Sequence, residues 1–125
     1  MNLLLDTHAL IWALENNPTL STPARAAIIN GKNNVYVSAA SVWEMSIKQA
    51  LGKLEVPDNL FEEIKAHRFI HLPIALAHGD VAGKLPAIHQ DSFDRMLIAQ
   101  ALIENLVLVT RDQYIPQYAV KVLQA

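Results

Sequence analysis

The sequence predicts an α/β fold, a three-layer α/β/α domain in which helices cover both faces of a central parallel sheet of four or five strands. Short strand-like runs alternate along the chain with longer helix-like stretches, which is typical of βαβ units. Most of these runs are almost entirely apolar, as in strands that are buried on both faces. The 125 residues suit one domain, and we expect residues 1–125 to form it.

The first strand is expected at the N-terminus. NLLLD (2–6) is an apolar run of strand length, and THALIWALEN (7–16) continues with apolar residues at helical spacing until Pro18 ends the pattern. A second helix is expected at 24–30, because a Ser-Thr-Pro start precedes it and Gly31 follows it.

The second strand–helix pair follows directly. VYV (35–37) is rich in strand-forming residues. SAASVWEMSIKQALG (38–52) reads as a helix that Ser38 or Ser41 caps and Gly52 closes.

The middle of the chain is less regular. Residues 58–68 read as a helix with Asp58 as its cap, and FIHL (69–72) as a strand that ends before a proline. Residues 74–85 suggest a shorter helix that is interrupted or finished near its two glycines.

The C-terminal part contains the most apolar helix pattern, SFDRMLIAQALIEN (92–105). LVLVT (106–110) follows as a second buried strand. RDQYIPQY (111–118) suggests a loop or helical turn, and VKVL (120–123) a last edge strand.

Composition limits the functional classes. No apolar run approaches the roughly 18 residues that a membrane span needs, and no export signal is visible. The absence of cysteine is compatible with the cytoplasm, where we expect the protein. The net charge of −2 does not exclude a nucleic-acid partner. If four of the 12 acidic residues bound cations, the remaining acids would be outnumbered by the 10 lysines and arginines.

Four acidic residues are predicted to meet at one edge of the sheet. Asp6 ends the first strand and Asp112 closely follows LVLVT, so both lie at the carboxyl ends of parallel strands, where ligands bind in open α/β sheets. Glu44 is near the start of the helix after VYV, and Asp94 is in the first turn of the last long helix.

Each acid also has an ordinary structural interpretation. Asp6 suits a helix cap, Glu44 could pair with Lys48 four residues later, Asp94 suits the positive end of a helix, and Asp112 could be a loop acid. The case for a site rests on the topology, which brings all four to the same edge.

Four segments resemble the successive motifs of PIN-domain proteins, particularly the VapC-like toxins of toxin–antitoxin operons: LLLDTHALIW, SAASVWEMSIK, HQDSFDRMLIAQAL and LVLVTRD. The resemblance covers almost the whole chain. It implies a PIN-like fold and a ribonuclease in which Asp6, Glu44, Asp94 and Asp112 bind Mg²⁺ or Mn²⁺, with Thr110 supporting the cluster. It also implies an RNA substrate, a small protein antitoxin that lies in a groove beside the active site, and a homodimer.

The chemistry of such a quartet is consistent with this function. Carboxylates a few ångströms apart repel one another, and divalent cations or protons relieve the repulsion. Oxygen ligands without cysteine favour Mg²⁺ or Mn²⁺ over zinc. We expect hydrolysis of RNA by water without a covalent enzyme intermediate. Asp6, Asp94 and Glu44 would hold the principal ion, and Asp112 a second ion directly or through water.

Basic side chains adjacent to these acids are candidates for phosphate contacts, namely Lys48, Arg95 and Arg111, although ion pairs with the acids explain them equally well. His8 and His89 could serve as a general base or as structural hydrogen-bonding residues, and the second role is favoured.

Other interpretations stay open at this stage. Trp12 and Trp43 lie on apolar helical stripes and suit the core or an interface better than base stacking. A receiver-like Mg²⁺-binding phospho-acceptor domain also gathers acids at the end of a parallel sheet, but the residues after Asp6 and LVLVT do not suit it. A catalytically silent PIN-like binding module is the third possibility.

Overall fold

The computed structural model describes residues 1–125 and confirms the α/β class, with a five-stranded sheet in the order β3-β2-β1-β4-β5. All four strand pairings are parallel. The strands are β1 (Asn2–Leu5), β2 (Asn34–Ser38), β3 (Ile70–Leu72), β4 (Val107–Thr110) and β5 (Val122–Gln124). β1 is the central strand, between β2 and β4, as its fully buried leucines require.

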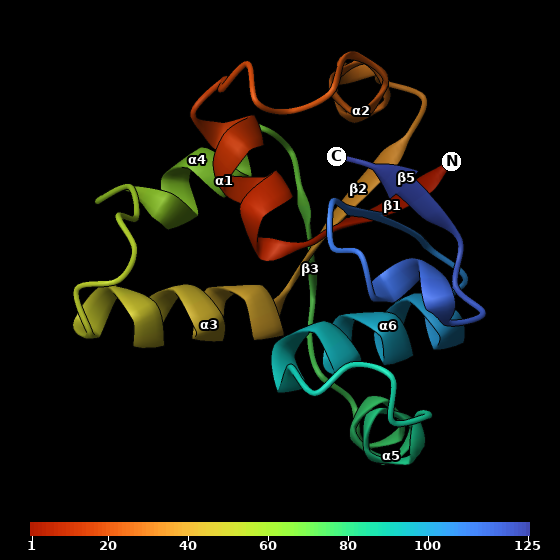
Figure 1. The fold of residues 1–125 in the computed structure, drawn as a ribbon. Helices are drawn as coiled ribbons and strands as arrows, with labels where there is room; N and C mark the ends of the chain where they lie inside the picture. The colour runs from red at the N-terminus through yellow and green to blue at the C-terminus, as the bar shows by residue number, and fades with distance from the viewer.

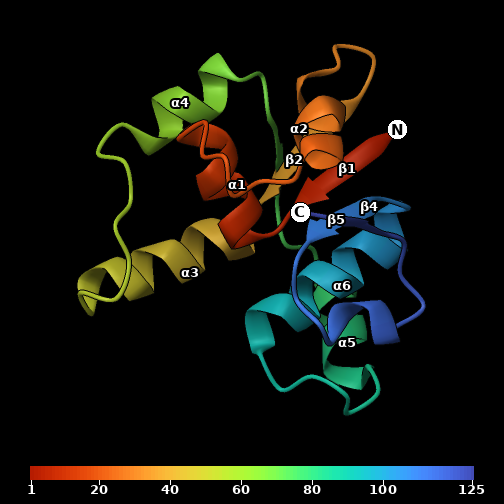
Figure 2. The same ribbon diagram turned by 45° about the horizontal axis from the view of Figure 1, so that its top comes forward.

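Helices cover both faces of the sheet (Figure 1). They are α1 (Thr7–Leu14), α2 (Thr22–Ile29), α3 (Ala39–Ala50), α4 (Leu60–Ala66), α5 (Leu76–Lys84) and α6 (Ser92–Glu104). α1, α2 and α4 lie on one face, whereas α6 lies on the other with α5 packed against it (Figure 2). None of these helices has the length and apolar character needed to cross a membrane.

The two faces have separate apolar cores. Leu3 and Leu5 of β1 point into the larger core beneath α1, α2 and α4, and Leu4 points into the smaller core beneath α6. This alternation follows from the two-residue period of a strand.

Side-chain caps fix the starts of four helices. The capping residues of α1, α2, α3 and α6 are Asp6, Ser21, Ser38 and Asp91. Each accepts a hydrogen bond from a main-chain N–H in the first turn that would otherwise lack a partner.

Two details differ from the sequence-based expectation. α4 begins after Asn59 without a side-chain cap, so the prediction of Asp58 as its cap is wrong. α5 runs unbroken through Gly79 and ends at Lys84, so the prediction of an end near Gly83 is confirmed and that of an interruption at Gly79 is wrong. Glycine costs a helix only about 1 kcal/mol, and packing of α5 against α6 offsets that cost.

A buried polar pair joins β2, α6 and the end of β3. The Ser38 hydroxyl donates to Gln100 Oε1 at 2.6 Å and accepts from Ala40 N–H at 2.9 Å. Gln100 Nε2 donates to the Pro73 carbonyl at 3.2 Å. This network fixes the start of α3 relative to α6, the two helices that supply Glu44 and Asp94 to the acidic edge.

We predict that Ser38→Ala lowers the free energy of unfolding by about 1 to 3 kcal/mol, because it removes a helix cap and leaves a buried Gln100 oxygen without its donor. Ser41→Ala is the matched control, since the Ser41 hydroxyl is buried without any hydrogen-bond partner, and its removal should cost less than about 0.5 kcal/mol or stabilise the fold. Urea unfolding followed by circular dichroism measures both. Equal destabilisation by the two variants would contradict this account.

Candidate metal centre

A polar cavity of about 320 Å³ opens at the carboxyl end of β1 and β4. Five carboxylates line it, from Asp6, Glu44, Asp91, Asp94 and Asp112. Two cationic side chains, Lys48 and Arg111, share the lining with Thr7, His8 and Trp12. The structure therefore brings the four predicted acids to one cavity. Five acids against two cations leave negative charge that favours a bound cation.

Asp6 is both a helix cap and a cavity residue. Its main-chain N–H donates to the Val109 carbonyl at 3.0 Å, and its Oδ1 accepts from Ala9 N–H at 2.8 Å. Asp6 is 8 % exposed, and burial raises the pKa of its carboxyl despite hydrogen bonding with Thr110 and Ala9, which lowers it. The two interpretations of Asp6 are thus compatible, because capping orients the carboxylate in the cavity wall.

Glu44 is held by two protein partners. Its Oε1 accepts from the Thr7 hydroxyl at 2.5 Å, and its Oε2 pairs with Lys48 Nζ at 2.5 Å. The hydrogen bond with Glu44 raises the pKa of Lys48. The predicted pairing of Glu44 with Lys48 is present, so Glu44 would have to release a partner, or share an oxygen, to ligate an ion.

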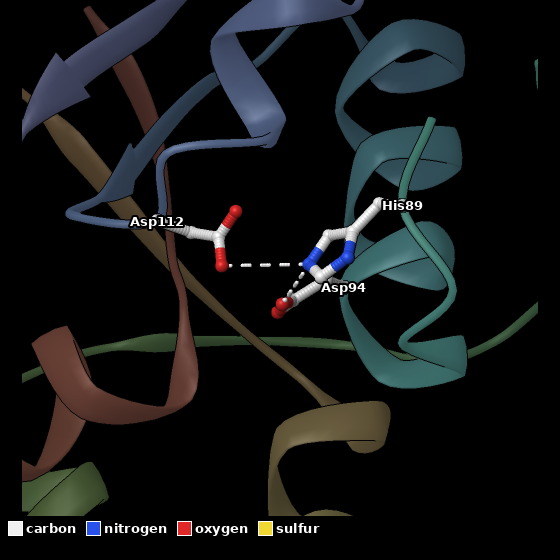
Figure 3. Close-up of side chains that lie close together, drawn as sticks. All are labelled: His89, Asp94 and Asp112. Atoms are coloured by element: carbon white, nitrogen blue, oxygen red, sulfur yellow. Dashed lines mark hydrogen bonds and ion pairs between the residues drawn. The ribbon is translucent and has the colours of Figure 1, made fainter. Parts of the chain in front are cut away.

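Asp94 and Asp112 meet at His89 (Figure 3). His89 Nε2 lies 2.8 Å from Asp94 Oδ2 and 3.4 Å from Asp112 Oδ2. One ligand atom from each of the three residues lies within 4.8 Å of the others. Burial, followed by the charge of Asp91, raises the pKa of Asp94 to about 7, while its hydrogen bond with His89 acts in the opposite direction.

Asp112 presents one oxygen to this cluster and uses the other locally. Its Oδ1 accepts from Tyr114 N–H at 2.8 Å and Ile115 N–H at 3.2 Å, which starts the short 3₁₀ turn at Ile115–Gln117. Its main-chain N–H donates to the Thr110 hydroxyl at 3.0 Å. Thr110 thus contacts two members of the acidic cluster, Asp112 and Asp6.

Asp91 is a cavity residue that the sequence analysis missed. It caps α6, and its Oδ1 accepts from Asp94 N–H at 3.0 Å. The signal in the sequence was an aspartate immediately before the SFDR helix, in a position typical of a cap. As the cap of α6, Asp91 also places a negative charge beside Asp94.

The three predicted phosphate contacts have different surroundings. Arg95 does not line the cavity; its guanidinium donates to the carbonyls of Ala82, Leu85, Pro86 and His89 and to the Tyr118 hydroxyl. Arg111 lines the cavity, donates to two main-chain carbonyls and lies 4.8 Å from the Trp12 ring centroid. Lys48 also lines the cavity and pairs with Glu44.

The two tryptophans also differ. Trp12 lines the cavity while packing against the larger core. Trp43 is 60 % exposed on α3 and packs edge-on against Phe93, with ring centroids 5.1 Å apart. Trp43 is therefore not a core residue and is available to an interface.

Comparison with known protein families gives a match between residues 3–121 and the model of the PIN domain. The chain belongs to the PIN domain family. This assignment sets aside the receiver-like alternative. No curated protein gives a significant sequence match.

Solved structures with the same fold include chains from VapBC2 of Rickettsia felis bound to a promoter DNA fragment (14 % identity, TM-score 0.73, covering 98 % of each chain). DNA-bound VapBC from Salmonella typhimurium gives 16 % identity and a TM-score of 0.71, over 98 % of this chain and 97 % of that one. VapBC-1 from nontypeable Haemophilus influenzae gives 22 % identity and a TM-score of 0.63, over 99 % and 98 %. At these identities the likeness establishes the fold.

The donor set of the PIN-domain cavity suits a divalent cation. Carboxylate oxygens are the ligands that Mg²⁺ and Mn²⁺ prefer. Caps or turns hold one oxygen each of Asp6 and Asp112, which fixes the direction of the carboxylate. Burial and the charge of Asp91 raise the pKa of Asp94 to about 7. A bound cation would act in the opposite direction, because positive charge favours the ionised carboxylate.

We predict that the cation-free protein loses stability as the pH rises. The pKa of Asp94 is raised from 3.8 to about 7 in the folded state, so the folded protein binds more protons than the unfolded chain between these values. Its free energy of unfolding should fall by about 2 to 3 kcal/mol between about pH 5 and pH 8. Asp94→Asn should weaken this dependence clearly, and Asp6, whose pKa burial also raises, should account for what remains. Urea unfolding in EDTA measures both proteins, and parallel pH curves would contradict the assignment.

Proposed function

We propose that this PIN-domain protein is a metal-dependent ribonuclease that uses Mg²⁺ or Mn²⁺ at Asp6, Glu44, Asp94 and Asp112. The observation that carries the proposal is the convergence of these acids, from segments far apart in the sequence, on one polar cavity at the carboxyl edge of the sheet. The choice of RNA as substrate rests on the likeness of the sequence to VapC-like toxins. We take residues 1–125 to act as one domain.

A divalent cation in this cavity would supply positive charge to a phosphodiester and acidify the attacking water. The protein's own groups hold the ligands in place: the Ala9 N–H fixes Asp6, and the main chain of the 3₁₀ turn fixes Asp112. Lys48 and Arg111 are the cavity's cationic side chains and would face the phosphates of a bound strand. The Arg95 guanidinium is occupied by protein acceptors, so we assign it to the support of the loop before α6.

The presence of all four acids speaks against a silent module that binds RNA alone, because RNA binding gains nothing from clustered carboxylates. An RNA cleavage assay distinguishes the nuclease from a silent binding module, because the silent module would bind a cation or RNA without cutting the strand.

We further propose that this nuclease is the toxin of a toxin–antitoxin pair. The solved structures with the same fold include VapBC assemblies and a toxin–antitoxin complex from Klebsiella pneumoniae. An apolar groove of about 380 Å³ lies between α3, α4 and β3, with Val42, Phe61 and Leu72 in its lining. This groove would suit the apolar side chains of a small antitoxin. The exposed apolar side chains of α3 would suit a separate contact with a second copy of the chain in a homodimer.

We predict that the wild-type protein cleaves a mixture of structured and unstructured RNAs with Mg²⁺ or Mn²⁺ and not with EDTA. Asp94→Asn should lower the rate at least about a hundredfold, because it removes a charged ligand. Asp80→Asn is the matched control, since Asp80 is exposed and pairs with Lys84 on α5, outside the cavity. Equal rates for Asp94→Asn and wild type would mean that the cleavage occurs at another site or comes from a contaminating nuclease.

We predict that the isolated chain is a dimer at micromolar concentration by light scattering. Trp43→Ser should shift the population toward monomer, because it removes the large exposed apolar side chain of α3. Leu76→Ser is the matched control, since Leu76 is 96 % exposed on a different helix, α5. A wild-type chain that stays monomeric would contradict the dimer without bearing on the nuclease.

A further inference from the structure

His89 offers a ring nitrogen to two of the carboxylates of the metal centre, Asp94 and Asp112. Its Nε2 lies 2.8 Å from Asp94 Oδ2 and 3.4 Å from Asp112 Oδ2, and its side chain is 12 % exposed (Figure 3). It is also the only histidine in a compact three-residue group of possible ligands. The function proposed above uses acids alone and gives this imidazole no role.

The spacing of the three ligand atoms suits one ion. Two ligands at right angles on an octahedral ion, with bonds of about 2.1 Å, lie roughly 3 Å apart. The distances from His89 Nε2 to the two aspartates lie on either side of this value. An ion could therefore bind between the three atoms with small side-chain movements.

The loop that carries His89 is fixed before any ligand binds. His89 N–H donates to the Tyr118 hydroxyl at 2.8 Å, and the His89 carbonyl accepts from Arg95 at 3.2 Å. The imidazole also packs on the Tyr114 ring, with centroids 5.0 Å apart. These contacts come from α6 and the segment after β4, the same segments that supply Asp94 and Asp112. The segments that supply Asp94 and Asp112 thus also hold the loop that carries His89.

We propose that His89 Nε2 binds directly to the divalent cation held by Asp94 and Asp112. This inference rests on the proposed metal site. A neutral imidazole ligates through one ring nitrogen while the other keeps its proton. Imidazole favours transition-metal ions, whereas a purely carboxylate site also suits Mg²⁺. The site should consequently bind Mn²⁺ more tightly than Mg²⁺.

The direct test is electron spin echo spectroscopy of the Mn²⁺-loaded protein. A coordinated imidazole gives a ¹⁴N modulation of the Mn²⁺ echo, and a histidine that only hydrogen-bonds to the carboxylates lacks this strong coupling. We expect the modulation in wild type, its replacement by a ¹⁵N signal when histidine is ¹⁵N-labelled, and its loss in His89→Asn. The isotope experiment needs no variant, so it stands even if His89→Asn folds poorly.

His8→Asn is the matched control, because His8 is the other histidine near the cavity and lies in its lining. This variant should keep the modulation. Calorimetric titration should show that His89→Asn loses about tenfold or more in Mn²⁺ affinity and much less in Mg²⁺ affinity. Modulation that is absent from wild type, or that disappears with His8 and not with His89, would overturn the proposal.

The outcome is separable from that of the nuclease proposal. RNA cleavage that depends on Mn²⁺, together with no ¹⁴N modulation, would refute the role of His89 and leave the nuclease standing. A ¹⁴N signal in a protein that does not cut RNA would support the His89 ligand and refute the nuclease.

Discussion

Mutual repulsion among buried carboxylates is the constraint on which the rest of this structure depends. β1 and β4 are adjacent and parallel, so Asp6 and Asp112, which follow them, reach the same edge of the sheet. α6 adds Asp94 and its cap Asp91 beside them. The pKa of Asp94 is raised first by burial and then by the charge of Asp91, so both the fold and the neighbouring acids favour its protonated form. A divalent cation would relieve the same repulsion without protonation.

The fold stabilises this arrangement through main-chain donors and not through a surplus of cations. Asp6 and Asp91 cap the helices that follow them, and Asp112 starts a 3₁₀ turn. In each case at least one carboxylate oxygen accepts main-chain N–H groups, which orients the side chain and offsets part of its burial cost. Structural and functional interpretations of an acidic residue therefore need not compete, since a cap can also orient a ligand.

The sequence was sufficient to predict the parallel sheet and the edge at which Asp6, Glu44, Asp94 and Asp112 meet, because buried parallel strands leave plain apolar runs and their carboxyl ends coincide. The surroundings of Arg95 and Asp91 depend on tertiary contacts, which the sequence pattern does not contain. Arg95 is predicted to contact phosphate, and the structure adds that its guanidinium donates to carbonyls of α5 and the loop that follows it and to a distant tyrosine, which no residue pattern reveals. Asp91 was missed because a cap and a cavity carboxylate look the same in a sequence.

The central claim is that these acids bind a divalent cation, and diffraction from Mn²⁺-soaked crystals at the manganese absorption edge tests it most directly. The account predicts an anomalous peak in the cavity, within bonding distance of Asp94 and at least one of Asp6, Glu44 and Asp112. Crystals of Asp94→Asn should lack the peak or show it much weaker. An empty cavity at millimolar Mn²⁺ and slightly alkaline pH, or a peak confined to the exposed acids of another surface, would contradict the account.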